Sequence, residues 1–196
     1  MNLEELRTLM LSGKVYNDLD PELIAARART VALTDDYNRL PTDDAAGRMK
    51  ILRSLLASVG ESAFFEPTLR CEFGFHVKVG ERFYANFDCV LLDGGGIEIG
   101  DDVLFGPRVS VFTTNHSLDP TERRNGACIA KPVKIGSAVW LGGGVHVTPG
   151  VEIGDGVVVG AGSVVTRNLP SNTLAAGVPC RVIREITLRD KLGFQA

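Results

Sequence analysis

The sequence is poor in several residue types and patterns that would mark particular classes of protein. Its 196 residues include only three histidines, one tryptophan and four cysteines, and no apolar run is long enough to span a membrane. The cysteines, at positions 71, 89, 128 and 180, show no C-x-x-C spacing, so we expect reduced thiols and a cytoplasmic location. The first residues, MNLEELRTLMLSGK, contain acidic side chains and no continuous apolar core, so we expect no signal peptide.

Charge and composition narrow the class further. A formal net charge of −3 argues against a nucleic-acid-binding surface spread over the protein. A content of 44% hydrophobic and 23% charged residues is typical of a globular protein. The length suits one domain, or one domain with a small appendage.

A six-residue repeat between Ile135 and Thr166 is the strongest pattern in the sequence. Apolar residues fill the first position of each unit, at Ile135, Leu141, Val147, Ile153, Val159 and Val165, and the fifth position is Val139, Val145, Val151, Val157 and Ser163. A period of six fits short extended sides joined by tight turns, with both of these positions pointing inward. Three sides make a triangular coil, and stacked coils would bury a continuous apolar prism.

The repeat also occurs earlier in the chain, with two interruptions. Val79, Ala85 and Leu91 are six apart, the register shifts by two at residues 93–96, and the period resumes from Ile99. The second interruption, residues 113–132, is polar and contains His116. Long polar insertions in a repeat array usually form loops that carry function.

The first 60 residues lack the sixfold period, and their apolar spacing predicts helices over residues 2–11, 21–33 and 42–59. Asp20 before Pro21 is a typical helix start, with the aspartate as cap. We therefore expect a helical segment over residues 1–66, a repeat domain over 67–186 with the inserted loop 113–132, and a tail over 187–196.

Several segments outside the repeat resemble a known family. SGKVYNDLDPEL, FYANFDCVLLD, TTNHSLDP, VWLGGG and AAGVPCRVIREI together resemble the maltose and galactoside O-acetyltransferase group, which includes nodulation-type sugar acetyltransferases. The similarity covers residues 5–186. It implies a mainly β fold, a left-handed parallel β-helix, with a short α-helical N-terminal segment. It also implies a homotrimer with sites between subunits, which moves acetyl from acetyl-CoA to a sugar hydroxyl without a metal.

Acetyl transfer from a thioester to an alcohol needs a base, a donor for the oxyanion and alignment of both substrates. His116 aligns with the family's catalytic histidine, and an imidazole, with a reference pKa of about 6.5, suits general-base work at neutral pH. His76 and His146 each lie between residues expected to point inward, so we interpret them as structural or surface residues.

The resemblance assigns the acceptor and the cofactor to two further sets of residues. The acceptor contacts would be Asp18, Arg27, Tyr84, Asn86, Asp93 and Cys128. Turn or capping roles remain open for Asp18, Asn86 and Asp93, and a solvated helix face for Arg27. Cys128 falls in GACIAKP, where relatives tend to have a larger residue, so the acceptor's identity does not transfer with the resemblance.

The same resemblance implies that Trp140 lies beside the thioester and that the Gly143 N–H meets its carbonyl oxygen. Some relatives have a serine at the position of Gly143. Acetyl-CoA would further contact Ala161, Thr166, Arg167, Arg181 and Arg184, with guanidinium groups suited to its phosphates. A trimer-packing role for Trp140 and a solvated edge for the two C-terminal arginines are the alternatives. No P-loop sequence is present.

Other functions fit the sequence less well. A xenobiotic or antibiotic acetyltransferase of the same fold normally lacks this N-terminal segment, and a serine acetyltransferase has a longer helical one. A zinc carbonic anhydrase of this fold needs three histidines, yet Thr121 stands five residues after His116. An acyl-cysteine route is disfavoured because no cysteine has an obvious base partner in sequence. A non-catalytic assembly protein remains open.

Overall fold

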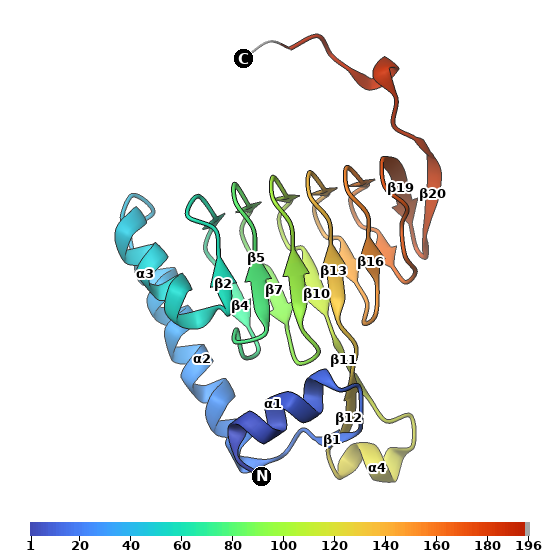
Figure 1. Ribbon diagram of the computed structural model, residues 1–196. Coiled ribbons are helices and arrows are strands. Elements are labelled where there is room, and N and C mark those ends of the chain that lie inside the picture. The colour runs from blue at the N-terminus through green and yellow to red at the C-terminus, as the bar shows by residue number, and fades with distance from the viewer. Residues whose placement is uncertain (195–196) are drawn as a thin grey trace.

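A computed structural model describes residues 1–194 as a stack of three-sided coils with helices at one end and along one corner (Figure 1). The first side consists of β2 (Ser58–Val59), β5 (Val77–Val79), β8 (Ile97–Ile99), β13 (Val133–Ile135) and β16 (Glu152–Ile153). The second side consists of β3 (Phe64–Phe65), β6 (Tyr84–Ala85), β9 (Leu104–Phe105), β14 (Trp140–Leu141), β17 (Val158–Val159) and β19 (Thr173–Gly177), with β20 (Cys180–Glu185) antiparallel at its edge. The third side consists of β4 (Leu69–Cys71), β7 (Cys89–Leu92), β10 (Ser110–Phe112), β15 (His146–Val147) and β18 (Val164–Val165).

The sixfold repeat has the orientation predicted for it. Every first and fifth position between Ile135 and Val165 is buried, and the core runs through the whole stack. Successive coils pair in parallel, so Ile99, Ile135 and Ile153 lie one above another on the first side. Burial of such an apolar column along its length is the main stabilising term of the stack. Ser163 is the one polar member, and its hydroxyl donates to the Gly160 carbonyl at 2.6 Å.

The N-terminal segment contains α1 (Leu3–Leu11), the short strand β1 (Tyr16–Asn17), α2 (Pro21–Arg39) and α3 (Ala45–Leu55). The predicted cap is confirmed, because the Asp20 side chain accepts the Glu22 N–H. Helix α2 is longer than the predicted range 21–33, since Tyr37 packs on the stack and donates its hydroxyl to the Phe65 carbonyl at 2.7 Å.

The coils begin earlier in the chain than the boundary expected at residues 66 and 67. Helix α3 ends at Leu55 rather than near residue 59, because Ala57 already bonds to the Val77 carbonyl at 2.9 Å. Val59 and Phe65 then pair with Val79 and Ala85 of the next coil. These two residues are six apart, so a short piece of the repeat precedes the predicted boundary.

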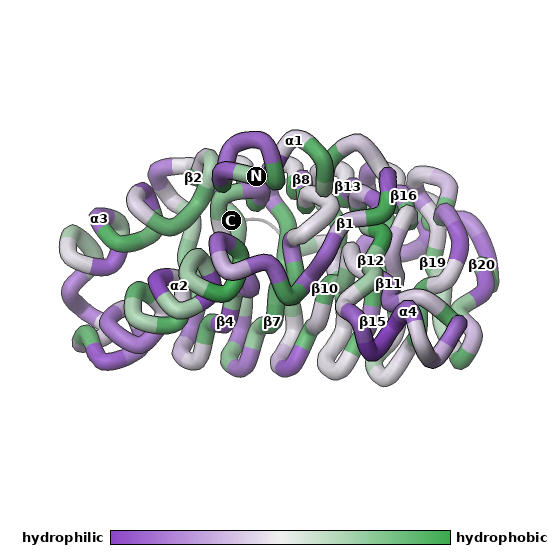
Figure 2. The backbone as a smooth tube through the Cα atoms, turned by 90° about the horizontal axis from the view of Figure 1, so that it is seen from below, coloured by the Kyte–Doolittle hydropathy of each residue, from purple (hydrophilic) through white to green (hydrophobic). Residues whose placement is uncertain are grey.

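The insertion at residues 113–132 is an ordered hairpin rather than an open loop. It comprises β11 (Thr114–His116), α4 (Pro120–Arg124) and β12 (Ala127–Ala130). Strand β12 pairs on one edge with β11 and on the other with β1, so the hairpin and the N-terminal segment form one three-stranded sheet. Seen from below, α1, β1, β12, β11 and α4 lie together across the bottom of the stack (Figure 2).

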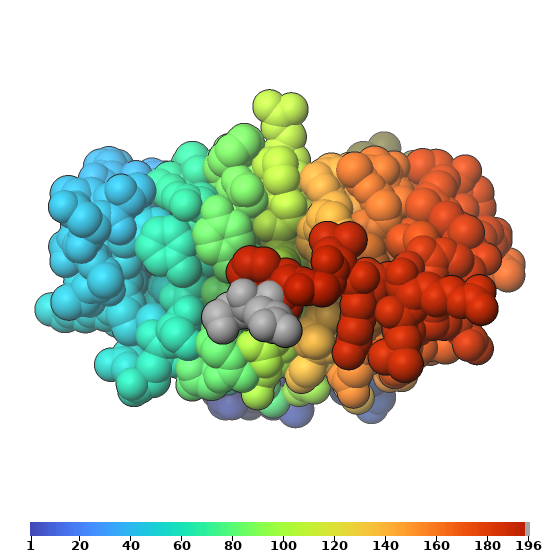
Figure 3. Space-filling model, turned by 90° about the horizontal axis from the view of Figure 1, so that it is seen from above, coloured from blue at the N-terminus to red at the C-terminus, as the bar shows by residue number. Residues whose placement is uncertain are grey.

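The C-terminal part closes the other end of the stack. After β20 the chain forms η1 (Leu188–Asp190) and runs back above the coils (Figures 1 and 3). The predicted tail, 187–196, includes two residues outside the described part of the chain. None of the helices within residues 1–194 combines the length and apolar character needed to cross a bilayer.

Candidate active site

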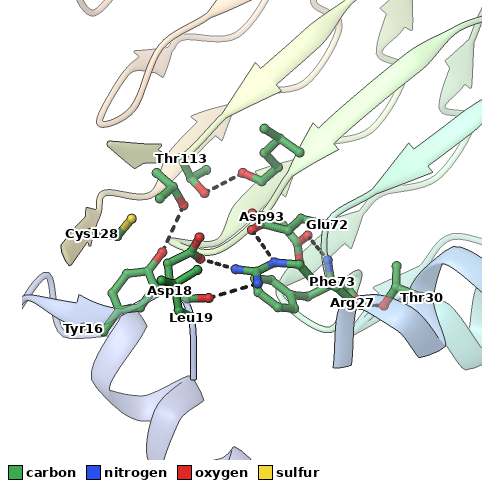
Figure 4. Close-up of polar contacts among 12 residues, drawn as sticks. Tyr16, Asp18, Leu19, Arg27, Thr30, Glu72, Phe73, Asp93, Thr113 and Cys128 are labelled. Carbon is green, nitrogen blue, oxygen red and sulfur yellow. Dashed lines mark hydrogen bonds and ion pairs between the residues drawn. The ribbon is translucent and has the colours of Figure 1, made fainter. Parts of the chain in front are cut away.

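Polar side chains gather at the corner between the third and first sides. Strands β4, β7 and β10 end there, and the residues that follow them are Glu72, Asp93 and Thr113. The N-terminal segment adds Asp18, just after β1, and Arg27, from α2 (Figure 4). The hairpin adds His116 and Cys128. Residues distant in sequence therefore meet at one corner, and we call this group the corner site.

His116 and Cys128 are paired positions on neighbouring antiparallel strands. Their side chains touch, with 3.0 Å between Cys128 Sγ and His116 Nδ1. His116 is exposed, whereas Cys128 is only 1% exposed. The sulfur therefore lies beneath the imidazole and holds one edge of the ring, while the rest of the ring faces solvent.

This contact corrects one expectation from the sequence, because Cys128 does have a base partner. It still makes a poor nucleophile. Burial, followed by the charges of Asp18 and Glu72, raises the pKa of the Cys128 thiol to about 11, so the sulfur stays protonated at neutral pH. A protonated and buried sulfur cannot attack a thioester, so the acyl-cysteine route remains disfavoured on this new ground.

Arg27 links two carboxylates of the corner site. It forms an ion pair with the Asp18 carboxylate and also donates to the Asp18 carbonyl at 3.0 Å. Its Nε donates to Glu72 Oε1 at 3.1 Å, and the guanidinium carbon lies 5.0 Å from the centre of the Phe73 ring. These contacts hold Arg27 and both acids in fixed positions, which argues against the alternative of a solvated helix face.

Glu72 was not among the residues predicted from the sequence. Its side chain is 15% exposed, and burial raises its pKa from 4.5 to about 7, although Arg27 acts in the opposite direction. One signal was present in the sequence. Cys71 points inward, so alternation turns Glu72 outward at the end of a strand that reaches the same corner as Asp93.

Asp93 lies at this corner but does not present its carboxylate to solvent. It is fully buried and accepts backbone N–H groups of Phe73, Gly74 and His76 at 2.9, 3.1 and 3.2 Å. Burial raises the pKa of the Asp93 carboxyl, and the three N–H donors oppose that shift. Within one chain its observed role is to organise the turn, which is the alternative left open by the sequence.

Tyr16 and Thr114 complete the floor of the corner site, with their oxygens 3.3 Å apart. Burial raises the pKa of the Tyr16 hydroxyl, which is therefore neutral. A side chain on Gly94 would put its Cβ 2.6 Å from Thr114 Oγ1. The glycine thus lets the hairpin approach the end of β7 closely.

Of the other two histidines, His146 has the outward position that alternation implies, whereas His76 is buried. His76 is buried against the edge of Phe75, with 4.5 Å between ring centres, and burial lowers its pKa to about 4. His146 lies half-buried on the outer face of the third side and stacks on Phe112 at 5.9 Å.

A second group of predicted residues lies on the second side and its corner with the third. Tyr84 and Trp140 are outward positions on the two coils that flank the coil of Leu104, with which both pair, and Trp140 is 52% exposed. Asn86 caps the corner by accepting the Phe87 N–H at 2.8 Å. The backbone of Asn86 is not in the left-handed region, so the prediction of a left-handed corner asparagine was wrong. The left-handed residue of this turn is Asp88, at φ 64°.

Gly143 and Ala161 occupy equivalent places on successive coils at that corner. A side chain at Gly142 would not fit beside them, since its Cβ would lie 2.7 Å from the Ala161 nitrogen. Neither the Gly143 nor the Ala161 N–H has a hydrogen-bond acceptor among residues 1–194, although the flanking Gly142, Gly144 and Gly162 N–H groups are bonded. Two free donors in a row are available to a ligand.

The remaining predicted residues are exposed in the last coils. Thr166 and Arg167 follow β18 and so lie at the corner between the third and first sides, in a later coil than the corner site, whereas Arg181 and Arg184 lie on β20. Arg184 is already engaged by a bidentate pair with Asp190 at 2.9 and 2.6 Å, which raises the pKa of its guanidinium. Among the described residues, Arg181 hydrogen-bonds only to the Cys180 carbonyl.

The two groups of predicted residues are not in one place. In a three-sided coil each side lies opposite the corner made by the other two, so the second side faces away from the corner site. A hollow of 920 Å³ on the first side contains none of the predicted residues. Its lysines and glutamates neutralise one another, as in the Lys78–Glu98 pair at 3.0 Å.

A three-sided parallel coil interrupted by a histidine-bearing hairpin defines the class of hexapeptide-repeat transferases. Comparison with known proteins agrees. The maltose acetyltransferase hexapeptide capping motif matches residues 9–60, and the bacterial transferase hexapeptide motif, with six repeats, matches residues 132–167.

Individual relatives are similar over almost the whole chain. Galactoside O-acetyltransferase of Escherichia coli is 41% identical over 92% of this chain and 89% of its own, and nodulation protein L of Rhizobium meliloti is 43% identical over 88% and 94%. A solved maltose O-acetyltransferase from Clostridium difficile matches with a TM-score of 0.90 and 46% identity, covering 95% of this chain and 98% of its own. A galactoside acetyltransferase in complex with coenzyme A matches with a TM-score of 0.89 and 39% identity, over 94% and 92%. The chain therefore belongs to the maltose and galactoside O-acetyltransferase group of the hexapeptide-repeat acyltransferase family.

Proposed function

We propose that this acetyltransferase moves an acetyl group from acetyl-CoA to a hydroxyl of a sugar or glycoside, with His116 as the general base. The observation that carries the proposal is the exposed His116 imidazole, anchored through Nδ1 by Cys128 and bordered by the Asp18–Arg27–Glu72 group. A base, its support and groups that bind hydroxyls thus meet at one corner.

The mechanism requires the tautomer of His116 in which Nδ1 carries the proton and donates to the Cys128 sulfur, because Nε2 then has a free lone pair for the acceptor hydroxyl. Nε2 then takes the proton of the acceptor hydroxyl, and the alkoxide attacks the thioester carbonyl carbon. The tetrahedral intermediate collapses by breaking the carbon–sulfur bond, and the CoA thiolate takes the proton from His116.

The acceptor would lie against Asp18, Arg27 and Glu72. Carboxylates accept hydrogen bonds from hydroxyl groups and the guanidinium donates hydrogen bonds to hydroxyl oxygens, so this group suits a polyol. Mutual ion pairing fixes their geometry before the acceptor binds, which lowers the entropic cost of alignment. Cys128 would act through His116 rather than as the predicted direct contact, because it is buried.

Acetyl-CoA would lie along the corner of the second and third sides. The free N–H groups of Gly143 and Ala161 support a role for Gly143 in stabilising the oxyanion and for Ala161 in binding the pantetheine arm. Trp140 would flank the thioester, and Thr166, Arg167 and Arg181 would contact the rest of the cofactor. Arg184 would first have to release Asp190.

The opposite placement of the two groups supports a site shared between copies of the chain. The corner site of one copy would face Tyr84, Asn86 and Trp140 of the next, and three copies arranged in a ring would complete three sites. The homotrimer is therefore part of the proposal. A cytoplasmic location, expected from the cysteine pattern, also stays a prediction.

The test is release of free CoA from acetyl-CoA against a panel of maltose, glucose, galactosides and hydroxylated xenobiotics. His116→Ala should lower turnover about 100-fold or more with unchanged acetyl-CoA binding, while Leu118→Ala, an exposed change in the same hairpin, should have no such effect. Full turnover by His116→Ala would refute the role of His116 as general base. Release with xenobiotics alone would refute the sugar acceptor.

A further inference from the structure

The corner site contains an unusual set of donor atoms. One carboxylate oxygen of Asp18, one imidazole nitrogen of His116 and the Cys128 sulfur all lie within 4.8 Å of one another. A thiolate, an imidazole and a carboxylate are the ligand types that proteins use for Zn²⁺ and chemically similar soft cations. No pattern in the sequence indicates this set, because its members come from separate segments.

Backbone pairing holds these three residues in place. His116 and Cys128 are register partners on β11 and β12, and Cys128 is in turn the partner of Tyr16 on β1, two residues before Asp18. Ligands carried by hydrogen-bonded strands keep their mutual positions better than ligands on free loops. His116 is exposed, which leaves a route for an ion to enter and an open coordination position.

The local charges favour a cation. The carboxylates of Asp18 and Glu72 lie at the site with one guanidinium, that of Arg27, paired to both. If Asp18 turned toward a metal, Arg27 would keep one carboxylate partner, because its Nε donates to Glu72 at 3.1 Å.

We propose that Asp18, His116 and Cys128 form a binding site for a soft divalent cation of the Zn²⁺ type, and that the bound ion inhibits acetyl transfer. Binding forms a metal–sulfur bond and releases the thiol proton to solvent. It also forms a metal–Nδ1 bond, which requires the ring proton to move to Nε2. The nitrogen that would accept the hydroxyl proton is then occupied. The inhibition rests on the proposed function of His116, whereas the binding does not.

Cd²⁺ is a direct probe of this site, because a Cd–thiolate bond has an ultraviolet charge-transfer band. We would titrate metal-free protein with Cd²⁺ at neutral pH and compare wild type with Cys128→Ala and with Cys180→Ala, a matched loss of a different buried cysteine. Wild type and Cys180→Ala should bind one ion per chain with the band, and Cys128→Ala should lack it. Asp18→Asn should weaken binding at least about tenfold.

A band that persists in Cys128→Ala, or that wild type lacks, would overturn the site. A second experiment measures CoA release with and without Zn²⁺, followed by a chelator. Turnover should fall as the site fills and return on chelation. Unchanged turnover with a filled site would overturn the inhibition alone. No CoA release with any acceptor of the panel would overturn the proposed function, while the Cd²⁺ band still decides the site.

Discussion

Glu72→Gln should raise the free energy of unfolding at pH 8, and the gain should be smaller at pH 5. Glu72 has a folded-state pKa of about 7 against 4.5 unfolded, so the folded state binds the extra proton between these values. Stability from this group is therefore greatest at acidic pH and falls as pH rises from about 4.5 through 7. For these two pKa values the loss between pH 5 and pH 8 is about 2.5 kcal/mol.

The measurement is the free energy of unfolding by denaturant at several pH values, at one fixed protein concentration in case assembly contributes. Subtracting the unfolding free energy of wild type from that of Glu72→Gln at each pH removes the contribution of all other titrating groups. The difference should grow by about 2 to 3 kcal/mol in favour of the variant from pH 5 to pH 8. Glu98→Gln, which removes an exposed carboxylate paired with Lys78, serves as control and should show no comparable trend.

A difference that stays constant with pH would mean that Glu72 does not change its protonation on folding. A difference of opposite sign would mean that the Arg27 ion pair outweighs burial, so that the ionised form is the favoured one. Either result would refute the claim that burial outweighs the Arg27 ion pair in setting the pKa of Glu72.

Three further predictions concern the corner site and the core. Asp93→Asn should lower the free energy of unfolding by about 2 kcal/mol, because an amide cannot accept hydrogen bonds from all three backbone N–H groups. If Asp93 served only to bind the sugar, the substitution would leave the free energy of unfolding unchanged. Cys128→Ala should lower kcat up to about tenfold and shift the pH profile of turnover, with an unchanged KM for acetyl-CoA; an unaltered profile would show that the sulfur does not support His116. Leu141→Ala should lower the unfolding free energy by about 3 kcal/mol in denaturant titrations, and a loss below about 1 kcal/mol would contradict the inward reading of the repeat.

The sequence was sufficient for the parts of the fold that are periodic. The hexads predicted which side chains point inward, and Asp20–Pro21 predicted a helix start, because both patterns act over a few neighbouring residues. Helix lengths were harder to predict. The end of α2 depends on Tyr37 reaching Phe65, a contact between distant segments that no local pattern contains.

The chemical partners at the corner site could not be predicted for the same reason. His116 was found from its motif, but its contact with Cys128 depends on the register of β11 and β12. The pairing of Arg27 with Glu72 joins a helix to a coil 45 residues away. Asp93 was found, yet its burial beneath the turn follows from the three N–H groups that converge on it.

The irregularities of the repeat mark where the chemistry lies. Leu91 and Val147 are equivalent on the third side, and Ile99 and Ile153 are equivalent on the first. Yet Leu91 and Ile99 are eight residues apart, whereas Val147 and Ile153 are six apart. The extra length makes the corner wider in the early coils, with room for the turns after β4 and β7 and for the packing of α1 and β1. The next coil replaces its corner with the whole hairpin. A regular hexad leaves only a short turn at this corner, as at residues 148–150, so a site with a base, acids and a guanidinium forms where the period fails.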